Sequence, residues 1–284
     1  MSVPPGGESP VARAVAYVAA RSAGPALDPR LRVTLHFHPD LSYRGRLVIE
    51  ALCEDGCYRS QFETQTSNGG LTAHPGGERW NWESRLFGAA YDHSPPSERP
   101  KYGSLDFRLR GSGGSPRFGS CWLRLGAASL ERTTFCYPDS VLEPVDFGTA
   151  SSMALVELAL SDTQDLLDDY VEAHVHGPVL LADDVEALVL DPCYRGGPVE
   201  EVARRLPCPV EWHGGFRLDV DELRRHPAYQ GERYVDLGCR LARDRLLTPA
   251  VIGDAARTGR HDPQDLKRVW HYLARFGAPG TGRR

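Results

Sequence analysis

The sequence predicts an α+β fold, in which a mixed β core is followed by an α/β to helical C-terminal lobe. Short apolar runs with strand-like alternation dominate between about residues 31 and 190, and helical spacing of apolar residues takes over after residue 193. The composition is that of an ordinary globular chain, since 41% of the 284 residues are hydrophobic and 25% are charged. This length allows one large domain or one domain with a smaller lobe.

The first predicted elements are a helix and a strand. The segment PVARAVAYVAARSAG has apolar residues at helical spacing and predicts a short helix that ends before Gly24. The segment LRVTLHFHPD alternates apolar and polar residues, which predicts a half-buried strand. Because side chains two residues apart on a strand share a face, we expect His36 and His38 to project to the same side.

The next elements continue the β core. RLVIEALCEDG predicts a short helix that ends near Gly56, and YRSQFET predicts a second strand. Two further short strands are predicted in YGSLDFRLR and RFGSCWLRL, within a region rich in Pro, Gly and Ser. The core therefore combines short strands with short helices.

A helix and two strands complete the predicted core after the loop-flanked segment TTFCYPDS. The helix covers about residues 150 to 160, and the strands lie in YVEAHVHGPVLL and VEALVLDP. One more strand is predicted in PVEWHGGF, between two helix-like segments of the C-terminal lobe.

The last helix has the clearest start signal in the chain. Asp262 is the predicted N-cap, Pro263 occupies the first helical position and Asp265 lies in the first turn. Val269 and Leu273 lie on one apolar stripe of this helix, so we expect that stripe to be buried.

Charge and cysteine content exclude several classes of protein. A net charge of −5 argues against a dedicated binder of phosphate backbones. The longest apolar runs are far shorter than the roughly 20 residues that span a bilayer, so we expect no membrane partner. The seven cysteines contain no Cys-x-x-Cys pair and the start of the sequence lacks a secretory signal, which predicts a cytoplasmic location.

Two pairs of histidines raise the question of a metal site. His36 and His38 share a predicted strand face, and His174 and His176 follow Glu172 on another. The four histidines leave a metal-dependent hydrolase as an alternative. No further residue completes a recognised ligand spacing, so we expect no metal. A non-catalytic domain that binds a nucleotide or a protein is the third alternative.

Six segments follow one another along the chain, namely HFHPD, YRSQFETQTSNGGLTAHPGG, RPKYGSL, PRFGS, RTTFCYPDS and YVEAHVHGPV. In this order they resemble a bacterial family known only as domain of unknown function 3626, over most of residues 30 to 215. A second run consists of RPKYGSL, FGSCWLRL and RTTFCYPDS. This run is similar to the middle of ADP-ribosyltransferase-type domains, which use a His-Tyr-Glu or Arg-Ser-Glu arrangement in that chain order.

The second resemblance implies a domain organisation and an activity. It implies an N-terminal segment with a short helix at 1–27, an ADP-ribosyltransferase-like core at 28–192 and a mostly helical lobe at 193–284. The implied activity is mono-ADP-ribosyltransferase: ADP-ribose passes from the substrate NAD to a protein or nucleic-acid acceptor, as in toxins and effectors. The C-terminal lobe is then expected to support the core or to dock the acceptor.

The resemblance also implies catalytic residues. Glu172 in VEAHVHG is the implied catalytic carboxylate, and Ser140 in PDS stands for the middle serine. The sequence departs from the family pattern because it has no Ser-Thr-Ser, and because His174 stands where a second Glu or a Gln is usual. The type of acceptor therefore stays open.

The NAD-binding residues follow from the same resemblance. His36 or His38 would hold the adenosine ribose, and Arg59, with Ser60 beside it, would face the diphosphate from the next strand. Tyr102 would form an aromatic shelf for nicotinamide. A cationic Arg or a protonated His would neutralise the diphosphate through charge-assisted hydrogen bonds.

Overall fold

The computed structural model describes residues 8–65 and 72–279. Among these residues, eight strands form one mixed sheet in the order β10-β9-β5-β1-β4-β8-β6-β7. Only the pair β9 and β10 is parallel. The strands of the sheet are β1 Val33–Phe37, β4 Lys101–Leu105, β5 Cys121–Leu125, β6 Thr133–Tyr137, β7 Asp146–Thr149, β8 Val171–Val175, β9 Val185–Leu190 and β10 Val210–Trp212.

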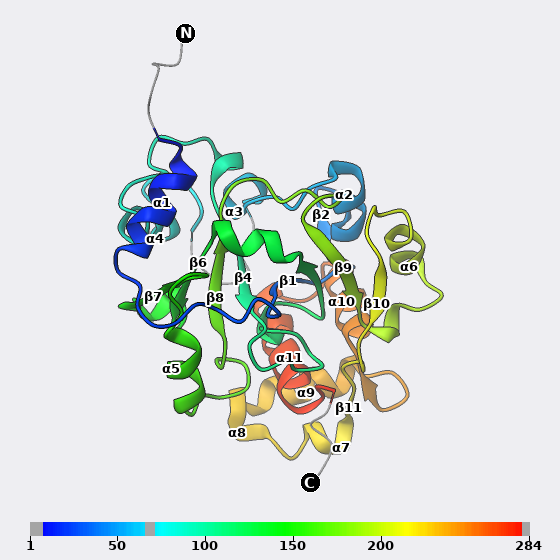
Figure 1. Cartoon of the computed structure of the whole chain (residues 1–284). Helices are drawn as coiled ribbons and strands as arrows, with labels where there is room; N and C mark the ends of the chain where they lie inside the picture. The colour runs from blue at the N-terminus through cyan, green and yellow to red at the C-terminus, as the bar shows by residue number, and fades with distance from the viewer. Residues whose placement is uncertain (1–7, 66–71, 280–284) are drawn as a thin grey trace.

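Helices and two small hairpins surround this sheet (Figure 1). The α-helices are α1 Pro10–Ala19, α2 Val48–Asp55, α3 Gln61–Thr64, α4 Glu78–Leu86, α5 Leu155–Ser161, α6 Pro198–Ala203, α7 Val220–Leu223, α8 Pro227–Gln230, α9 Glu232–Leu241, α10 Pro249–Arg257 and α11 Pro263–Phe276. The short 3-10 helices are η1 Pro96–Glu98, η2 Pro116–Phe118, η3 Ala127–Arg132, η4 Ser140–Leu142 and η5 Pro192–Tyr194. The hairpins pair β2 Ser42–Tyr43 with β3 Arg46–Leu47, and β11 Leu218–Asp219 with β12 Leu246–Leu247.

The two faces of the sheet differ in polarity. Ser104 on β4 lies opposite Thr34 on β1 and Glu172 on β8. Because side chains alternate along a strand, His36 and Tyr102 share the face of these three residues. Three neighbouring strands thus present polar side chains to the same side.

The opposite face carries the main hydrophobic core. Leu35, Leu105 and Ala173 lie on this face, and all three are buried. The apolar sides of α2, α5 and α6 belong to the same cluster. Burial of this face holds the strands in register, since a one-residue slip would exchange the apolar and polar faces.

Two further clusters complete the packing. Helices α1 and α4 pack against Cys136 on β6 and Phe147 on β7. The second cluster joins α7, α9, α10 and α11 around Leu223, Val235 and Leu273. In Figure 1, α7, α8, α9 and α11 gather at the end of the molecule opposite α1 and α2.

The structure confirms the α+β class and most of the predicted elements. Helices α1, α2, α5 and α11 and strands β8, β9 and β10 form where the sequence predicts them. Asp262 caps α11 by accepting a hydrogen bond from the backbone of Gln264 at 2.7 Å. Strand β10 extends the sheet past residue 192, where the core was predicted to end. Among the described residues, none of the helices combines the length and apolarity that a membrane crossing requires.

Two local predictions are wrong. The segment YRSQFET is not a strand, because Ser60 and Glu63 form a capping box that starts α3. The Ser60 hydroxyl accepts a hydrogen bond from the Glu63 backbone at 3.2 Å, and the Glu63 carboxylate accepts one from the Ser60 backbone at 2.8 Å. Arg59 therefore precedes a helix. Strand β1 is not half-buried, since all five of its residues are buried.

Candidate functional site

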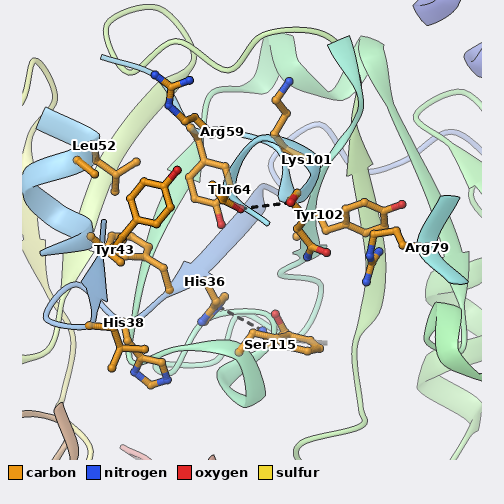
Figure 2. A pocket seen from close by; sticks show the side chains of 18 of the residues that line it. His36, His38, Tyr43, Leu52, Arg59, Thr64, Arg79, Lys101, Tyr102 and Ser115 are labelled. Carbon is orange, nitrogen blue, oxygen red and sulfur yellow. Dashed lines mark hydrogen bonds between the residues drawn. The ribbon is translucent and has the colours of Figure 1, made fainter. Parts of the chain in front are cut away.

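A cavity of about 450 Å³ opens on the polar side of the sheet, where the end of β1 meets the start of β4. Residues from β2, α2, α3, α4, η2, η4 and β8 also line it. Figure 2 shows His36 and His38 at one end, Tyr43 on one side, and Tyr102 beside Arg79 on the other. Six of the eight predicted site residues line it, namely His36, His38, Arg59, Tyr102, Ser140 and Glu172. Ser60 and His174 do not line it.

Glu172 is held rigidly in the cavity wall. Its Oε2 accepts hydrogen bonds from the backbone N–H of Ser140 at 3.3 Å and from the Ser140 hydroxyl at 3.0 Å. Its Oε1 accepts from Nε2 of His174 at 3.0 Å. Burial raises the pKa of Glu172, while the charge of Arg79 and the bonds from Ser140 act in the opposite direction. A fixed carboxylate with polar support is thus available to a bound molecule.

His174 lies behind this carboxylate and not in the cavity. Its ring is fully buried, and Nδ1 bonds to the hydroxyl of Thr134 at 3.3 Å while Nε2 serves Glu172. Burial lowers the pKa of His174 to about 3, so the ring is neutral at pH 7. His174 therefore orients Glu172 rather than touching a ligand.

His36 has no ring nitrogen left for a ligand. Its Nδ1 donates to the carbonyl of Gly119 at 3.1 Å, and its Nε2 accepts from the backbone N–H of Ser115 at 3.3 Å. Burial lowers the pKa of His36 to about 3. The neutral His36 ring carries no charge to offer a diphosphate.

His38 is the histidine that can meet a ligand. No group among the described residues hydrogen-bonds to its ring, which packs edge to face against Trp270 with centroids 4.7 Å apart. Burial lowers its pKa to about 4, so it too is neutral at pH 7. Of the two histidines predicted for the ribose, the geometry favours His38 as a neutral hydrogen-bonding partner.

Tyr102 and Arg79 form the opposite wall. The Tyr102 hydroxyl donates to Oε1 of Glu83 at 2.8 Å, which fixes the ring. The guanidinium carbon of Arg79 lies 4.1 Å from the centre of the same ring. The ring thus remains available as the predicted aromatic shelf, with a cation stacked on it.

Arg59 and Ser60 do not have the surroundings that the prediction assumed. Arg59 forms ion pairs with Asp55 at 2.7 Å and Glu63 at 3.2 Å, which neutralise its charge. Ser60 is fully buried as the cap of α3, and its hydroxyl donates to the carbonyl of Pro96 at 2.6 Å. Ser60 therefore caps α3 and does not line the cavity.

The four histidines do not form one metal site. Strand β4 separates β1, which carries His36, from β8, and His176 bonds through its two ring nitrogens to Tyr91 and Thr134 at 2.8 and 2.9 Å. Within residues 8–65 and 72–279, the one group with metal-ligand spacing is Cys136, Glu172 and His174.

Sequence reasoning missed several polar residues of the cavity, and three of them have unpaired buried atoms. Tyr43, Gln61 and Arg79 line it, and each has buried polar atoms without a hydrogen-bond partner among the described residues. These atoms are the Tyr43 hydroxyl, Oε1 of Gln61, and Nε and Nη1 of Arg79. Buried polar atoms are usually paired, so these side chains of the cavity wall retain unmet hydrogen-bonding capacity.

Comparison with known proteins identifies one family. Residues 32–163 and 152–276 match the model of a family described as "Protein of unknown function (DUF3626)". The match continues through α11, beyond the segments 30–215 that suggested it. No curated protein matches the chain.

Proposed function

We propose that this chain, which belongs to the DUF3626 family of proteins of unknown function, is a mono-ADP-ribosyltransferase that moves ADP-ribose from NAD to a macromolecular acceptor. The proposal includes an ADP-ribosyltransferase-like arrangement of the mixed sheet. The resemblance of its segments to such domains suggested this function, and the cavity now supplies a physical argument for it.

One observation carries the proposal. A histidine directly after β1, a tyrosine on β4 and a glutamate on β8 follow in that chain order on neighbouring strands, and all three line one cavity. The histidine is represented by His38, directly after β1, since His36 is internally bonded. This is the order that the resemblance predicts for the ribose-binding, nicotinamide-binding and catalytic positions.

The chemistry requires what Glu172 provides. When the bond between nicotinamide and ribose breaks, nicotinamide leaves with the bonding electron pair and positive charge develops on C1′ of the ribose. A carboxylate that already faces this position stabilises charge that is largest in the transition state. Ser140 and His174 hold the carboxylate in place, so it needs no reorientation during the reaction. The nucleophile of the acceptor then forms the new bond to C1′ and loses its proton to solvent.

The cavity also suits the other parts of NAD. Its volume of about 450 Å³ falls within the range of roughly 300–1,000 Å³ that is usual for small-molecule and cofactor sites. Tyr102 offers an aromatic surface to the nicotinamide ring, and apolar side chains of α2, Val48 and Leu52, line the wall beside Tyr43. Polar and apolar walls together fit a ligand with both rings and charged groups.

The test follows nicotinamide release and label transfer. The full chain is incubated with adenylate-labelled NAD and a cell lysate, and protein and nucleic-acid fractions are counted separately. We expect free nicotinamide and label on one fraction. Binding of NAD without release of nicotinamide would instead favour a binding domain, and bound metal that is required for hydrolysis of another substrate would favour the hydrolase.

A further inference from the structure

Among the described residues, one cation of the cavity has buried donors without a hydrogen-bond partner. Three basic side chains line it: Arg59, Arg79 and Lys101. Arg59 is paired with two carboxylates. The ammonium of Lys101 donates to three backbone carbonyls, at 2.9, 3.0 and 3.0 Å, and points away from Tyr102 in Figure 2.

Arg79 differs from Arg59 and Lys101 in having unpaired buried donors. It is 3% exposed, and its Nε and Nη1 have no hydrogen-bond partner within the described part of the chain. No carboxylate of the described residues lies within ion-pair distance of it, although Glu172 and Glu83 are near enough to act on it electrostatically. A buried guanidinium with unused donors is costly unless a ligand supplies the acceptors.

We propose that Arg79 is the anion-binding residue of the cavity and that it receives the diphosphate of a dinucleotide. Guanidinium presents a planar fork of donors that matches two phosphate oxygens at once. The inference rests on the proposed function for the identity of the dinucleotide as NAD, but the anion site itself depends only on the unmet donors of Arg79.

The position of Arg79 agrees with the covalent structure of NAD. The diphosphate is attached to the 5′ carbon of the nicotinamide ribose, so it must lie close to the sugar that Glu172 would face. Arg79 stacks on Tyr102, the proposed nicotinamide shelf, and its charge acts on Glu172. Arg79 therefore takes the role that the sequence assigned to Arg59.

The probes are inorganic pyrophosphate and ADP-ribose, with adenosine and nicotinamide as uncharged or phosphate-free comparisons. Binding is measured by calorimetry and by the shift in unfolding temperature of the full chain. We expect both phosphate compounds to bind the wild type. Failure of the wild type to bind either one would overturn the proposal whatever the variants do.

Three variants locate the anion. Arg79→Met keeps the aliphatic stem over Tyr102 and removes the charge, and we expect ADP-ribose to bind about 10- to 100-fold more weakly. Arg85→Met is the matched control, because Arg85 lies on the same helix, is paired with Glu143 and does not line the cavity. Loss of binding in Arg59→Met, with Arg79→Met unchanged, would contradict the assignment.

The stability of the ligand-free variant separates binding from structure. A ligand-binding Arg79 predicts that Arg79→Met without ligand unfolds within a few degrees of the wild type, because the cost of burying the guanidinium offsets its attraction to Glu172 and Glu83. A large fall would show a structural role and overturn the proposal. If Arg79→Met does not fold, Arg79→Lys must bind pyrophosphate at least about tenfold more weakly than the wild type, since it lacks the planar fork. Wild-type affinity there would overturn the proposal.

The two proposals fail in different ways. If ADP-ribose binds through Arg79 but no nicotinamide is released from NAD, the proposed anion site stands and the proposed transferase activity is contradicted. If Arg79→Met and the wild type release nicotinamide with the same KM for NAD, the proposed transferase activity stands and the proposed anion site is contradicted.

Discussion

His38 and Trp270 meet edge to face with ring centroids 4.7 Å apart, which joins the C-terminal helix to the wall of the cavity. The Trp270 indole N–H also donates to the carbonyls of Pro116 and Arg117, at 3.1 and 3.0 Å. The C-terminal lobe, expected to support the core, thus contacts a residue that lines the cavity. Its helix α11 holds both His38 and η2.

The first prediction concerns this contact. Trp270→Phe keeps an aromatic ring but removes the N–H donor from two buried carbonyls, so we expect a lower unfolding temperature and a KM for NAD raised roughly 3- to 10-fold. Calorimetry and nicotinamide release measure the two effects. Tyr234→Phe, on α9 and outside the cavity, is the control. If Trp270→Phe is destabilised but its KM for NAD is unchanged, α11 stabilises the fold without shaping the NAD site.

A second prediction tests the shelf. Tyr102→Phe loses the bond to Glu83 but keeps the ring, so we expect its KM for NAD to stay within about threefold of the wild type, whereas Tyr102→Ala should raise KM at least about tenfold. Steady-state kinetics on both variants measure the two KM values for NAD. Equal KM values for the two variants would show that the ring does not carry the nicotinamide.

Ser140 allows a prediction about pH. Its hydroxyl bonds to the ionised form of Glu172 and so lowers the pKa of that carboxyl against the effect of burial. Ser140→Ala should therefore raise the pKa of Glu172, and the acidic limb of the profile of kcat/KM against pH should move to higher pH. Ser140→Thr retains a hydroxyl and serves as the control. A shift of the limb toward lower pH would contradict this geometry.

Asp40 predicts how the stability of the protein depends on pH. This buried carboxyl bonds to the Tyr194 hydroxyl at 3.0 Å and lies 3.2 Å from Arg257 of α10, and burial raises its pKa from 3.8 to about 6. The folded protein therefore binds this proton more tightly than the unfolded chain does. The resulting stabilisation is complete below about pH 4 and is lost as the pH rises to about 6.

The corresponding variant is Asp40→Asn, which cannot ionise. Relative to it, the wild type should lose about 2 kcal/mol of unfolding free energy between pH 4 and pH 7. Urea denaturation at several pH values measures the difference. Parallel pH dependence of the two proteins would show that Asp40 does not titrate in this range.

Strands and helix ends could be predicted because they depend on local patterns. The alternation in β1 and the cap at Asp262 are visible in short segments of sequence. The prediction of a strand in YRSQFET is wrong because Ser60 and Glu63 form a capping box, an equally local signal, which starts a helix there.

The candidate site was only partly predictable, because its electrostatics arise from tertiary packing. The pairing of β6 with β8 brings Ser140 close to Glu172 across a separation of 32 residues. Helix α4, with the sequence ERWNWESRL, is mostly polar and gives no local sign that Arg79 is buried. Likewise, the neutral state of His36 follows from burial and from bonds to Gly119 and Ser115, which no sequence spacing reveals.

The most direct test of the proposed function is the rate of nicotinamide release from NAD by Glu172→Gln. This change preserves shape but removes the charge, so we expect the rate to fall at least about 100-fold while ADP-ribose still binds and the protein stays folded. Glu186→Gln is the matched control, because Glu186 lies on β9, pairs with Arg32 and does not line the cavity. It should keep the wild-type rate. A folded Glu172→Gln protein that releases nicotinamide as fast as the wild type would contradict the role of Glu172 and, with it, the account of this cavity.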